Sequence, residues 1–400
     1  SEINKMISLF FLFNITQSTS NKVIFIVYHN EDDIINSKEW ETLNIDNNKT
    51  LARMKTLTEL HGAPGFEDDV KAYLKTELEP FVDDFVYNRM GGIYGVKRSK
   101  VKNPKRVMVA AHMDEIGFMI TNITENGMIQ FTNLGGVATD IWQGQRLKVK
   151  SRKNEEITGV VANIPKHFRT GNEGAPKIED LLLDIGCENQ KDVRKRGIEI
   201  GDSIVPETPF TQLSEHRFSS KAWDNRYGCL LGIELLELLK DVELGYDLYV
   251  GANVQEEVGL RGAKASAELI DPDVAFVVDC SPANDMKGKQ NLSGELGAGT
   301  LIRIKDGTML LKPTFRDYLL DLADEFKIKH QYYISPGGTD GGEIHKAKIG
   351  IPTAVIGVCA RYIHSTNAVF DIRDYEAARE LLTQATTQLD DSKIEELQYK

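Results

Sequence analysis

The sequence of 400 residues contains little cysteine, and its cysteines are not spaced for metal or disulfide chemistry. The four cysteines are scattered along the chain, and none forms a Cys-x-x-Cys pair: Cys187, Cys229, Cys280 and Cys359. Isolated cysteines in apolar surroundings are typical of reduced thiols in a cytoplasmic protein. The pattern argues against a disulfide-stabilised secreted domain and against a thiolate zinc site, and we expect a cytoplasmic location.

The sequence also lacks a basic patch and a long apolar run. The formal net charge is -12 and the isoelectric point is near 5.3. No cluster of Lys and Arg is sustained enough to neutralise the phosphates of nucleic acid or of an anionic membrane. The apolar stretch Met6–Phe13 is too short to cross a bilayer. We therefore expect neither nucleic acid nor a membrane as a partner.

Residues 1–49 differ in composition from the rest of the chain. This range contains two short apolar segments, Met6–Phe13 and Val23–Tyr28, and then a stretch rich in Asn and Asp. The first segment has no clear positive region before it and no small-residue cleavage site after it. We interpret this segment as an N-terminal extension that is non-native or disordered, and a degenerate signal peptide is the alternative.

The remaining sequence predicts an α/β fold with an insertion. Runs of Val, Ile and Ala, such as Arg106–Ala111 and Asp273–Val278, indicate strands that are buried on both faces of a sheet. Between His112 and Asp224 the pattern changes to short β-like pieces separated by Gly, Asn and Pro. We expect a catalytic domain in two segments, residues 50–117 and 217–400, around a small β-rich domain at 118–216.

Acidic residues and histidines stand where these apolar runs end. Glu256 and Glu257 close the run that begins at Leu248, and His112 and Asp279 follow two other runs. Ligands gather at the carboxyl ends of strands in α/β sheets. Neighbours on an extended strand point to opposite sides, so one glutamate could bind a metal while the other faces a water molecule. A Glu-Glu pair on a solvated loop is the alternative interpretation.

Several long motifs give the chain a resemblance to a known family. In chain order they are Ala111–Met119, Ala222–Gly228, Val254–Ala263, Asp279–Ala283, Gly337–Asp340 and Cys359–Ser365. With these motifs the chain resembles the M42 family of di-metal aminopeptidases, and within it the members that remove glutamyl residues. The resemblance covers the chain from about residue 50 onward. It implies a zinc-exopeptidase-like mixed sheet sandwiched by helices, with an inserted PDZ-like or barrel-shaped domain used for dimerisation.

The same resemblance implies a set of metal ligands. One divalent cation would be bound by His112, Asp224 and Asp279. The second would be bound by Asp224, Glu257 and His364, so that Asp224 bridges the two. The resemblance also implies a cis peptide bond after Asp224. Imidazole and carboxylate ligands suit Zn, Co or Mn.

The resemblance assigns catalytic roles to two further carboxylates. Glu256 would be the general base that takes a proton from the shared water molecule. Asp114 would orient the His112 ring. A peptide substrate with an N-terminal Glu or Asp is the expected preference. A broad or leucyl-type aminopeptidase, a di-metal deacylase or carboxypeptidase, and a non-catalytic scaffold are the alternatives. A glycosidase is disfavoured, because strand neighbours that point in opposite directions cannot face each other across a glycosidic bond.

The substrate pocket and the assembly are less closely defined by the sequence. The expected pocket residues lie near the last motifs: Arg361, Gly337, Gly338 and Thr339. An acidic preference requires a cation, which Arg361, Arg303 or a lysine would supply, and a structural ion pair is the alternative role for Arg361. The family resemblance further implies a homo-oligomer, built from dimers through the inserted domain and gathered into a dodecamer.

Overall fold

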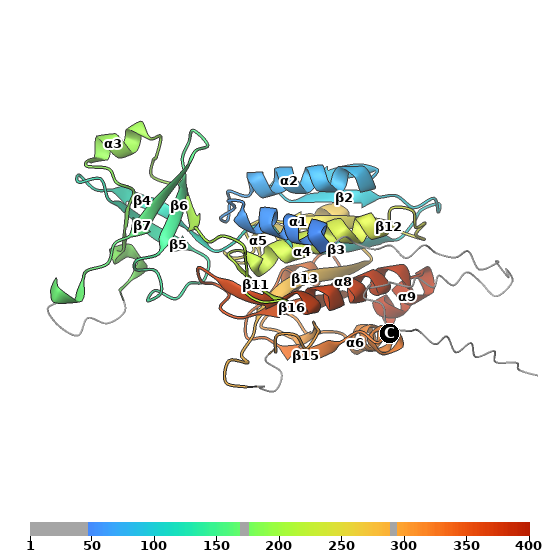
Figure 1. The fold of residues 1–400 in the computed structure, drawn as a ribbon. Coiled ribbons are helices and arrows are strands. Elements are labelled where there is room, and N and C mark those ends of the chain that lie inside the picture. The colour runs from blue at the N-terminus through green and yellow to red at the C-terminus, as the bar shows by residue number, and fades with distance from the viewer. Residues whose placement is uncertain (1–46, 169–175, 289–293) are drawn as a thin grey trace, which may run out of the picture.

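The computed structural model describes residues 47–168, 176–288 and 294–400. The first helix, α1 (Asn47–Glu59), begins inside the range that we expected to be an extension, and residues 1–46 lie outside the described residues. Two domains are visible in Figure 1, a larger one with a central sheet and a smaller one made mostly of strands.

A mixed sheet of eight strands forms the centre of the larger domain. Its strands, in spatial order, are β1 (Asp84–Tyr87), β2 (Ile93–Lys97), β12 (Asp247–Asn253), β3 (Arg106–His112), β13 (Val274–Pro282), β16 (Thr353–Ala360), β14 (Thr300–Lys305) and β15 (His330–Ile334). The four central strands β12, β3, β13 and β16 run parallel to one another. Their carboxyl ends therefore meet at one edge of the sheet.

Helices cover both faces of this sheet, because the strands are apolar on both sides. Along β3, Val107, Val109 and Ala111 pack against one group of helices, while Met108 and Ala110 pack against another. The first group contains α1, α2 (Asp68–Leu78), α4 (Trp223–Leu238), α6 (Pro313–Glu325), α8 (Ile372–Thr387) and α9 (Asp391–Tyr399). The second contains α5 (Arg261–Ile270) and α7 (Gly341–Ile344). Helix α4 is buried almost all round, as its apolar sequence predicts.

The smaller domain is a closed barrel of six strands. In spatial order these are β4 (Gly117–Ile123), β5 (Ile129–Leu134), β8 (Leu182–Asp184), β7 (Glu156–Val161), β6 (Arg146–Lys150) and β9 (Ser203–Pro206). Phe118, Phe131 and Trp142 fill its interior in edge-to-face contacts. The expected fold class, α/β with an inserted β-rich domain, is confirmed, and the insertion has the barrel form.

The shorter elements complete the fold. A separate three-stranded sheet contains β10 (Thr211–Gln212), β11 (Arg217–Ser220) and β17 (Ala368–Asp371). The remaining helices are α3 (Gln190–Lys195) and the 3-10 turns η1 (Glu79–Phe81), η2 (Lys166–Phe168) and η3 (Ile178–Asp180). All four cysteines are free. Within the described ranges, no helix combines the length and the apolar character that crossing a bilayer requires.

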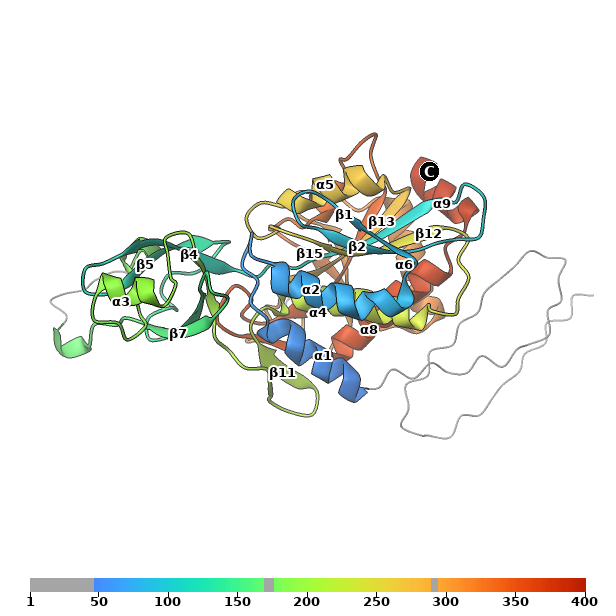
Figure 2. The same cartoon turned by 90° about the horizontal axis from the view of Figure 1, so that it is seen from above.

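The chain crosses between the two domains beside the carboxyl edge of the large sheet, as Figures 1 and 2 show. Glu115, on the outgoing crossing, is buried and pairs with Lys221 on the returning one at 2.6 Å. Arg226 at the start of α4 lies 3.1 Å from the same carboxylate. His61, in the loop after α1, shares a hydrogen bond of 2.7 Å with Ser203 of the barrel. These buried contacts hold the barrel against the catalytic domain next to the candidate site.

Candidate metal centre

Imidazole and carboxylate side chains gather at the carboxyl edge of the central sheet. His112 is the last residue of β3, Asp279 lies in β13, and Glu256 and Glu257 follow β12. His364 follows β16, and Asp224 comes from the first turn of α4. Residues that are far apart in the sequence are thus brought to one place by parallel strands and by the helix that packs on them.

One group of ligand atoms surrounds the buried ring of His112. Its Nε2 atom lies 3.3 Å from Asp224 Oδ1, 3.6 Å from Asp279 Oδ1 and 3.9 Å from Glu256 Oε2. Burial by itself would lower the pKa of His112, but the surrounding carboxylates raise it well above its usual value. The cluster of acids therefore favours positive charge at this position.

A second group surrounds His364, whose side chain is partly exposed. Its Nε2 atom lies 3.2 Å from Glu257 Oε2 and 3.5 Å from Asp224 Oδ2. Asp224 thus turns one carboxylate oxygen toward each histidine, which is the arrangement of a bridging ligand. The Asp224–Asn225 peptide bond is cis, as the resemblance implies, and the Asn225 side chain donates to the carbonyl of Val278 at 2.7 Å.

The donor set fits two divalent cations. Two groups of ligand atoms are close enough to hold an ion, one from His112, Glu256 and Asp279 and one from Asp224, Glu257 and His364. Asp224 Oδ1 and Glu257 Oε1 are buried and have no hydrogen-bond partner among the described residues. Buried carboxylate oxygens are costly without a partner or a cation. Nitrogen and oxygen donors of this kind are those that Zn, Co and Mn accept.

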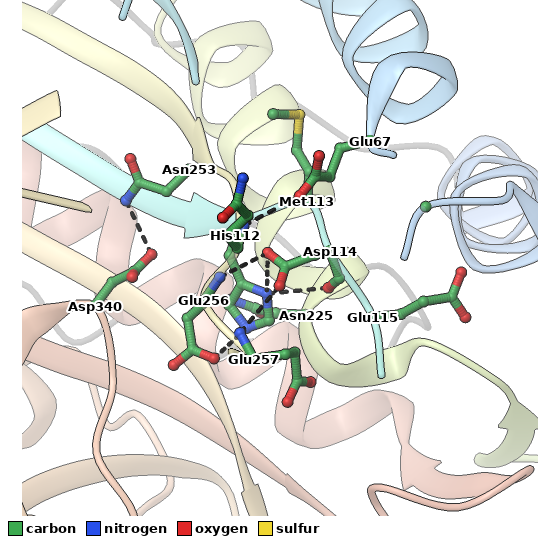
Figure 3. Close-up of polar contacts among 12 residues, drawn as sticks. Glu67, His112, Met113, Asp114, Glu115, Asn225, Asn253, Glu256, Glu257 and Asp340 are labelled. Atoms are coloured by element: carbon green, nitrogen blue, oxygen red, sulfur yellow. Dashed lines mark hydrogen bonds and ion pairs between the residues drawn. The ribbon is translucent and has the colours of Figure 1, made fainter. Parts of the chain in front are cut away.

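Glu256 and Glu257 lie in a turn after β12 and not on an extended strand. The expectation that strand alternation points them in opposite directions is therefore wrong. Strand β12 ends at Asn253, and Gln255 has a left-handed backbone with φ of 56°. The backbone N–H groups of Glu256 and Glu257 each donate to the Asp114 carboxylate at 3.0 Å, one to each oxygen (Figure 3). Because both amides are tied to one carboxylate, the turn directs Glu256 to the first group and Glu257 to the second.

Asp114 therefore has a second contact that the sequence did not indicate. Its carboxylate Oδ1 lies 3.5 Å from His112 Nδ1, and its backbone carbonyl lies closer to the same atom, at 3.1 Å. The carboxylate is shared between the ring and the glutamate turn. This single side chain can orient a histidine and hold the two glutamates at once.

Two buried acids near the centre were missed in the sequence. Glu67 accepts hydrogen bonds from the backbone of Gly65 at 2.8 Å and Gln255 at 3.1 Å, so it supports the glutamate turn from the other side. Asp340 accepts from Asn253 Nδ2 at 2.9 Å (Figure 3). Burial raises the pKa of each to about 7. Asp340 ends the Gly-Gly-Thr-Asp motif and could have been found there, whereas nothing in the local sequence marks Glu67.

A cavity of 360 Å³ opens beside both groups of ligands. Of the expected pocket residues, Gly337 and Gly338 line it, whereas Thr339 and Arg361 do not. Arg361 instead forms an ion pair with Asp285, with nitrogen to oxygen distances of 2.6 and 2.9 Å. Among the described residues, Arg303 is the arginine or lysine that lines the cavity.

Buried contacts hold Arg303 at the cavity wall. Its guanidinium donates to Ser281 Oγ at 2.7 Å and to the carbonyl of Cys280 at 3.3 Å. Asp306 lies 3.4 Å from the guanidinium, and the ring of Tyr333 lies 5.8 Å from it. The result is a fixed guanidinium beside the metal-binding groups, with the buried carboxylate of Asp306 as its ion-pair partner.

Comparisons with known proteins agree with this geometry. The glutamyl aminopeptidase of Lactococcus lactis subsp. cremoris is 43% identical over 350 residues, which cover 86% of this chain and 98% of that protein. The lysyl aminopeptidase of Pyrococcus furiosus is 31% identical over 329 residues, which cover 81% and 92%. The solved structure of the Pyrococcus horikoshii TET1 peptidase, which assembles into a tetrahedron or a large octahedral shell, superposes with a TM-score of 0.78 at 26% identity and covers 85% of this chain and 100% of that one.

The family description agrees with these relatives. The sequence profile described as M42 glutamyl aminopeptidase matches residues 91–381, which include strands β2 to β17 and all the candidate metal ligands. The likeness to the Lactococcus protein extends over almost the whole of that relative. The chain therefore is an aminopeptidase and belongs to the M42 glutamyl aminopeptidase family.

Proposed function

We propose that this protein is a metal-dependent aminopeptidase that holds two divalent cations, Zn, Co or Mn, in the two groups of ligands. His112, Asp224 and Asp279 would hold the first, and Asp224, Glu257 and His364 the second. The observation that carries this proposal is the orientation of Asp224, with one oxygen 3.3 Å from His112 Nε2 and the other 3.5 Å from His364 Nε2. A carboxylate shared between two ligand groups is typical of a two-metal site.

Glu256 is the residue that moves protons in this proposal. When bound, the cations would lower the pKa of a shared water molecule and stabilise negative charge on the scissile carbonyl oxygen. Glu256 accepts the proton of that water and delivers it to the leaving amine. Burial and then the charges of Asp279 and Asp340 raise the pKa of Glu256 well above its usual value, while His112 lowers it. The raised pKa favours transfer of the water proton to Glu256.

The cavity supports the removal of one N-terminal residue. Its 360 Å³ is within the size range of small-ligand sites, and it adjoins Glu256 on one side and the Gly337–Gly338 loop on another. Arg303 gives its wall a positive charge, which would attract the carboxylate of an N-terminal Glu or Asp. We therefore propose a preference for acidic N-terminal residues. A broad or leucyl-type preference remains the alternative.

We also propose that the protein is cytoplasmic and works as a homo-oligomer. The barrel contributes none of the proposed metal-ligand side chains, which supports a role in assembly through dimers. A solved structure of PhTET1-12s, 26% identical to this chain, is described as a dodecamer, which supports a dodecamer here. A mass near that of the 44.8 kDa monomer in light scattering would contradict this part of the proposal.

One assay tests the activity, its metal dependence and its preference together. The p-nitroanilides of Glu, Asp, Leu and Lys are offered to the protein with and without a chelator. We expect release from the acidic substrates to be fastest and to stop when the cations are removed. Turnover that survives complete chelation would overturn the metal-dependent mechanism. N-acyl amino acids and peptides with a blocked N-terminus are offered in parallel, and turnover of these alone would support a deacylase or carboxypeptidase.

A further inference from the structure

A loop of the barrel reaches the second group of ligands. The loop begins at Gly135, directly after strand β5, and Gly136 lies next to the ring of His364. A Cβ atom at Gly136 would be 3.7 Å from His364 Nδ1, and the backbone of Gly136 is one of the groups that raise the pKa of that histidine. The barrel, whose described residues include none of the candidate metal ligands, thus lies against a candidate ligand through its backbone.

The contact is made by the ring nitrogen that faces away from the other ligands. His364 Nε2 points to Glu257 and Asp224, at 3.2 and 3.5 Å. Its Nδ1 atom is the one beside Gly136. A metal-binding histidine usually donates its second ring N–H to a carbonyl or carboxylate, which fixes the tautomer and the direction of the ring. His364 lies in a loop with φ of 58° and is not held by a strand, so such a contact matters for its direction.

Glycine is required at the start of this loop. Gly135 has φ of 101°, and a Cβ atom there would lie 2.9 Å from Ile116 Cγ2 and 3.4 Å from Glu257 Cβ. The side chain of Asn133 donates to the carbonyl of Gly135 at 2.6 Å and holds the turn from the exposed side. At Gly136 no left-handed φ occurs, and among the described residues the atom within 4 Å of a Cβ there is His364 Nδ1. The close approach therefore depends on Gly135 and Asn133 and is made by the backbone of Gly136.

We propose that the barrel loop Gly135–Gly136 is a positioning element for the second metal position, because its backbone orients His364 toward Asp224 and Glu257. This inference rests on the two-metal site proposed above. It gives the inserted domain a part in the site of its own chain, in addition to any role in assembly. The loop lies beside two residues of the second group, His364 and Glu257, and neither Gly135 nor Gly136 lines the cavity itself.

Metal binding measured with Co²⁺ tests the proposal. Apo-protein is titrated against a competing chelator, and the step lost in His364→Ala identifies the second position. We expect Gly135→Ala to weaken that step by roughly tenfold or more, the effect usual for a lost outer contact of a ligand. Gly136→Ala is the matched control for a methyl group in this loop, and it should have a smaller effect because its Cβ makes only an ordinary contact.

Asn133→Asp tests the same contact without a change in size. The substitution replaces the donor to the Gly135 carbonyl by an acceptor on an exposed side chain, so the barrel should remain folded. Asn122→Asp is its control, since Asn122 is another exposed asparagine of the barrel and donates to Gln130. We expect Asn133→Asp to weaken the second step and to leave the first unchanged, although its added negative charge would by itself favour cation binding.

The outcomes separate this inference from the proposed function. Equal second-site affinity in Asn133→Asp and Asn122→Asp would overturn the role of the loop while leaving the two-metal site intact. A wild-type protein that binds only one ion, or none, would overturn the two-metal proposal itself. If Gly135→Ala fails to fold, the comparison of Asn133→Asp with Asn122→Asp still tests the role of the loop.

Discussion

The two histidines of the centre are held in different ways. His112 ends a central strand of the sheet, and its side chain is 2% exposed. His364 lies in a loop after β16 with a left-handed backbone, and its side chain is 37% exposed. The first position is therefore fixed by the packing of the sheet, whereas the second depends on loops, one of them from the barrel. A rigid core can support one half of a site while a neighbouring domain adjusts the other.

The most severe test of this comparison is a change that affects both positions at once. Asp224→Ala removes the carboxylate that faces both histidines. We expect kcat/KM to fall by roughly a thousandfold or more, because several kcal/mol of charge stabilisation depend on the bound cations. Metal analysis should show that both ions are lost or weakened. The exposed Asp241→Asn is the control, and retention of both ions in Asp224→Ala would contradict the bridging role.

The two glutamates of the turn should separate chemistry from metal binding. Glu256→Gln should bind both cations but lose roughly 10²- to 10⁴-fold in kcat, because the general base is gone. Glu257→Gln should weaken only the second position. Steady-state kinetics and metal content measured on both variants check this. Full activity in Glu256→Gln would exclude Glu256 as the base, and equal metal loss in the two variants would remove the distinction between them.

Arg303 lies near the first metal position, where burial raises the pKa of Asp279 and the charge of Arg303 lowers it. Its substitution tests whether the acidic preference comes from that side of the site. Arg303→Met should lower the ratio of kcat/KM for Glu- over Leu-p-nitroanilide by roughly 10- to 100-fold, the loss of one charge-assisted contact. Arg303→Lys should recover part of the ratio. Arg361→Met is the control, because Arg361 pairs with Asp285 away from the cavity. An unchanged ratio in Arg303→Met would place the acidic preference elsewhere.

The smallest expected effect is a pH dependence of stability in the chelated protein. Burial lowers the pKa of His364, but Glu257 and Asp224 raise it, to about 9; burial raises the pKa of Glu257 to about 8. Both groups bind protons more tightly when folded, so their contributions to stability are lost as pH rises toward 9. The slope cannot exceed about 1.4 kcal/mol per pH unit for each proton, and the contribution of His364 is smaller because its side chain is partly exposed.

Thermal unfolding between pH 6.5 and 9 measures this slope. The melting temperature of the chelated protein should fall as pH rises through this window. His364→Ala should have a shallower dependence than the parent chain. A melting temperature of the chelated parent that rises with pH would contradict the assigned direction. The raised pKa values assigned to His364 and Glu257 would then be wrong.

Much of the fold followed from periodicity in the sequence. Apolar runs such as Arg106–Ala111 can be buried on both faces only in a sheet covered by helices, and the short β-like pieces between His112 and Asp224 predicted a separate β-rich domain. The buried helix after Asp224 was equally clear, because it is apolar almost all round. Candidate ligands could be named because polar residues at the ends of buried strands meet at one edge of a sheet.

The tertiary structure decided what periodicity does not encode. Strand alternation predicted opposite directions for Glu256 and Glu257, but a turn held by Asp114 directs them. Arg303 and Arg361 are both arginines near motifs, and only their distances show that one lines the cavity while the other pairs with Asp285. The sequence by itself determined the chemical groups and the strands that carry them, since both depend on local pattern. Their partners, including the barrel loop beside His364, depend on contacts between segments that are distant in the chain.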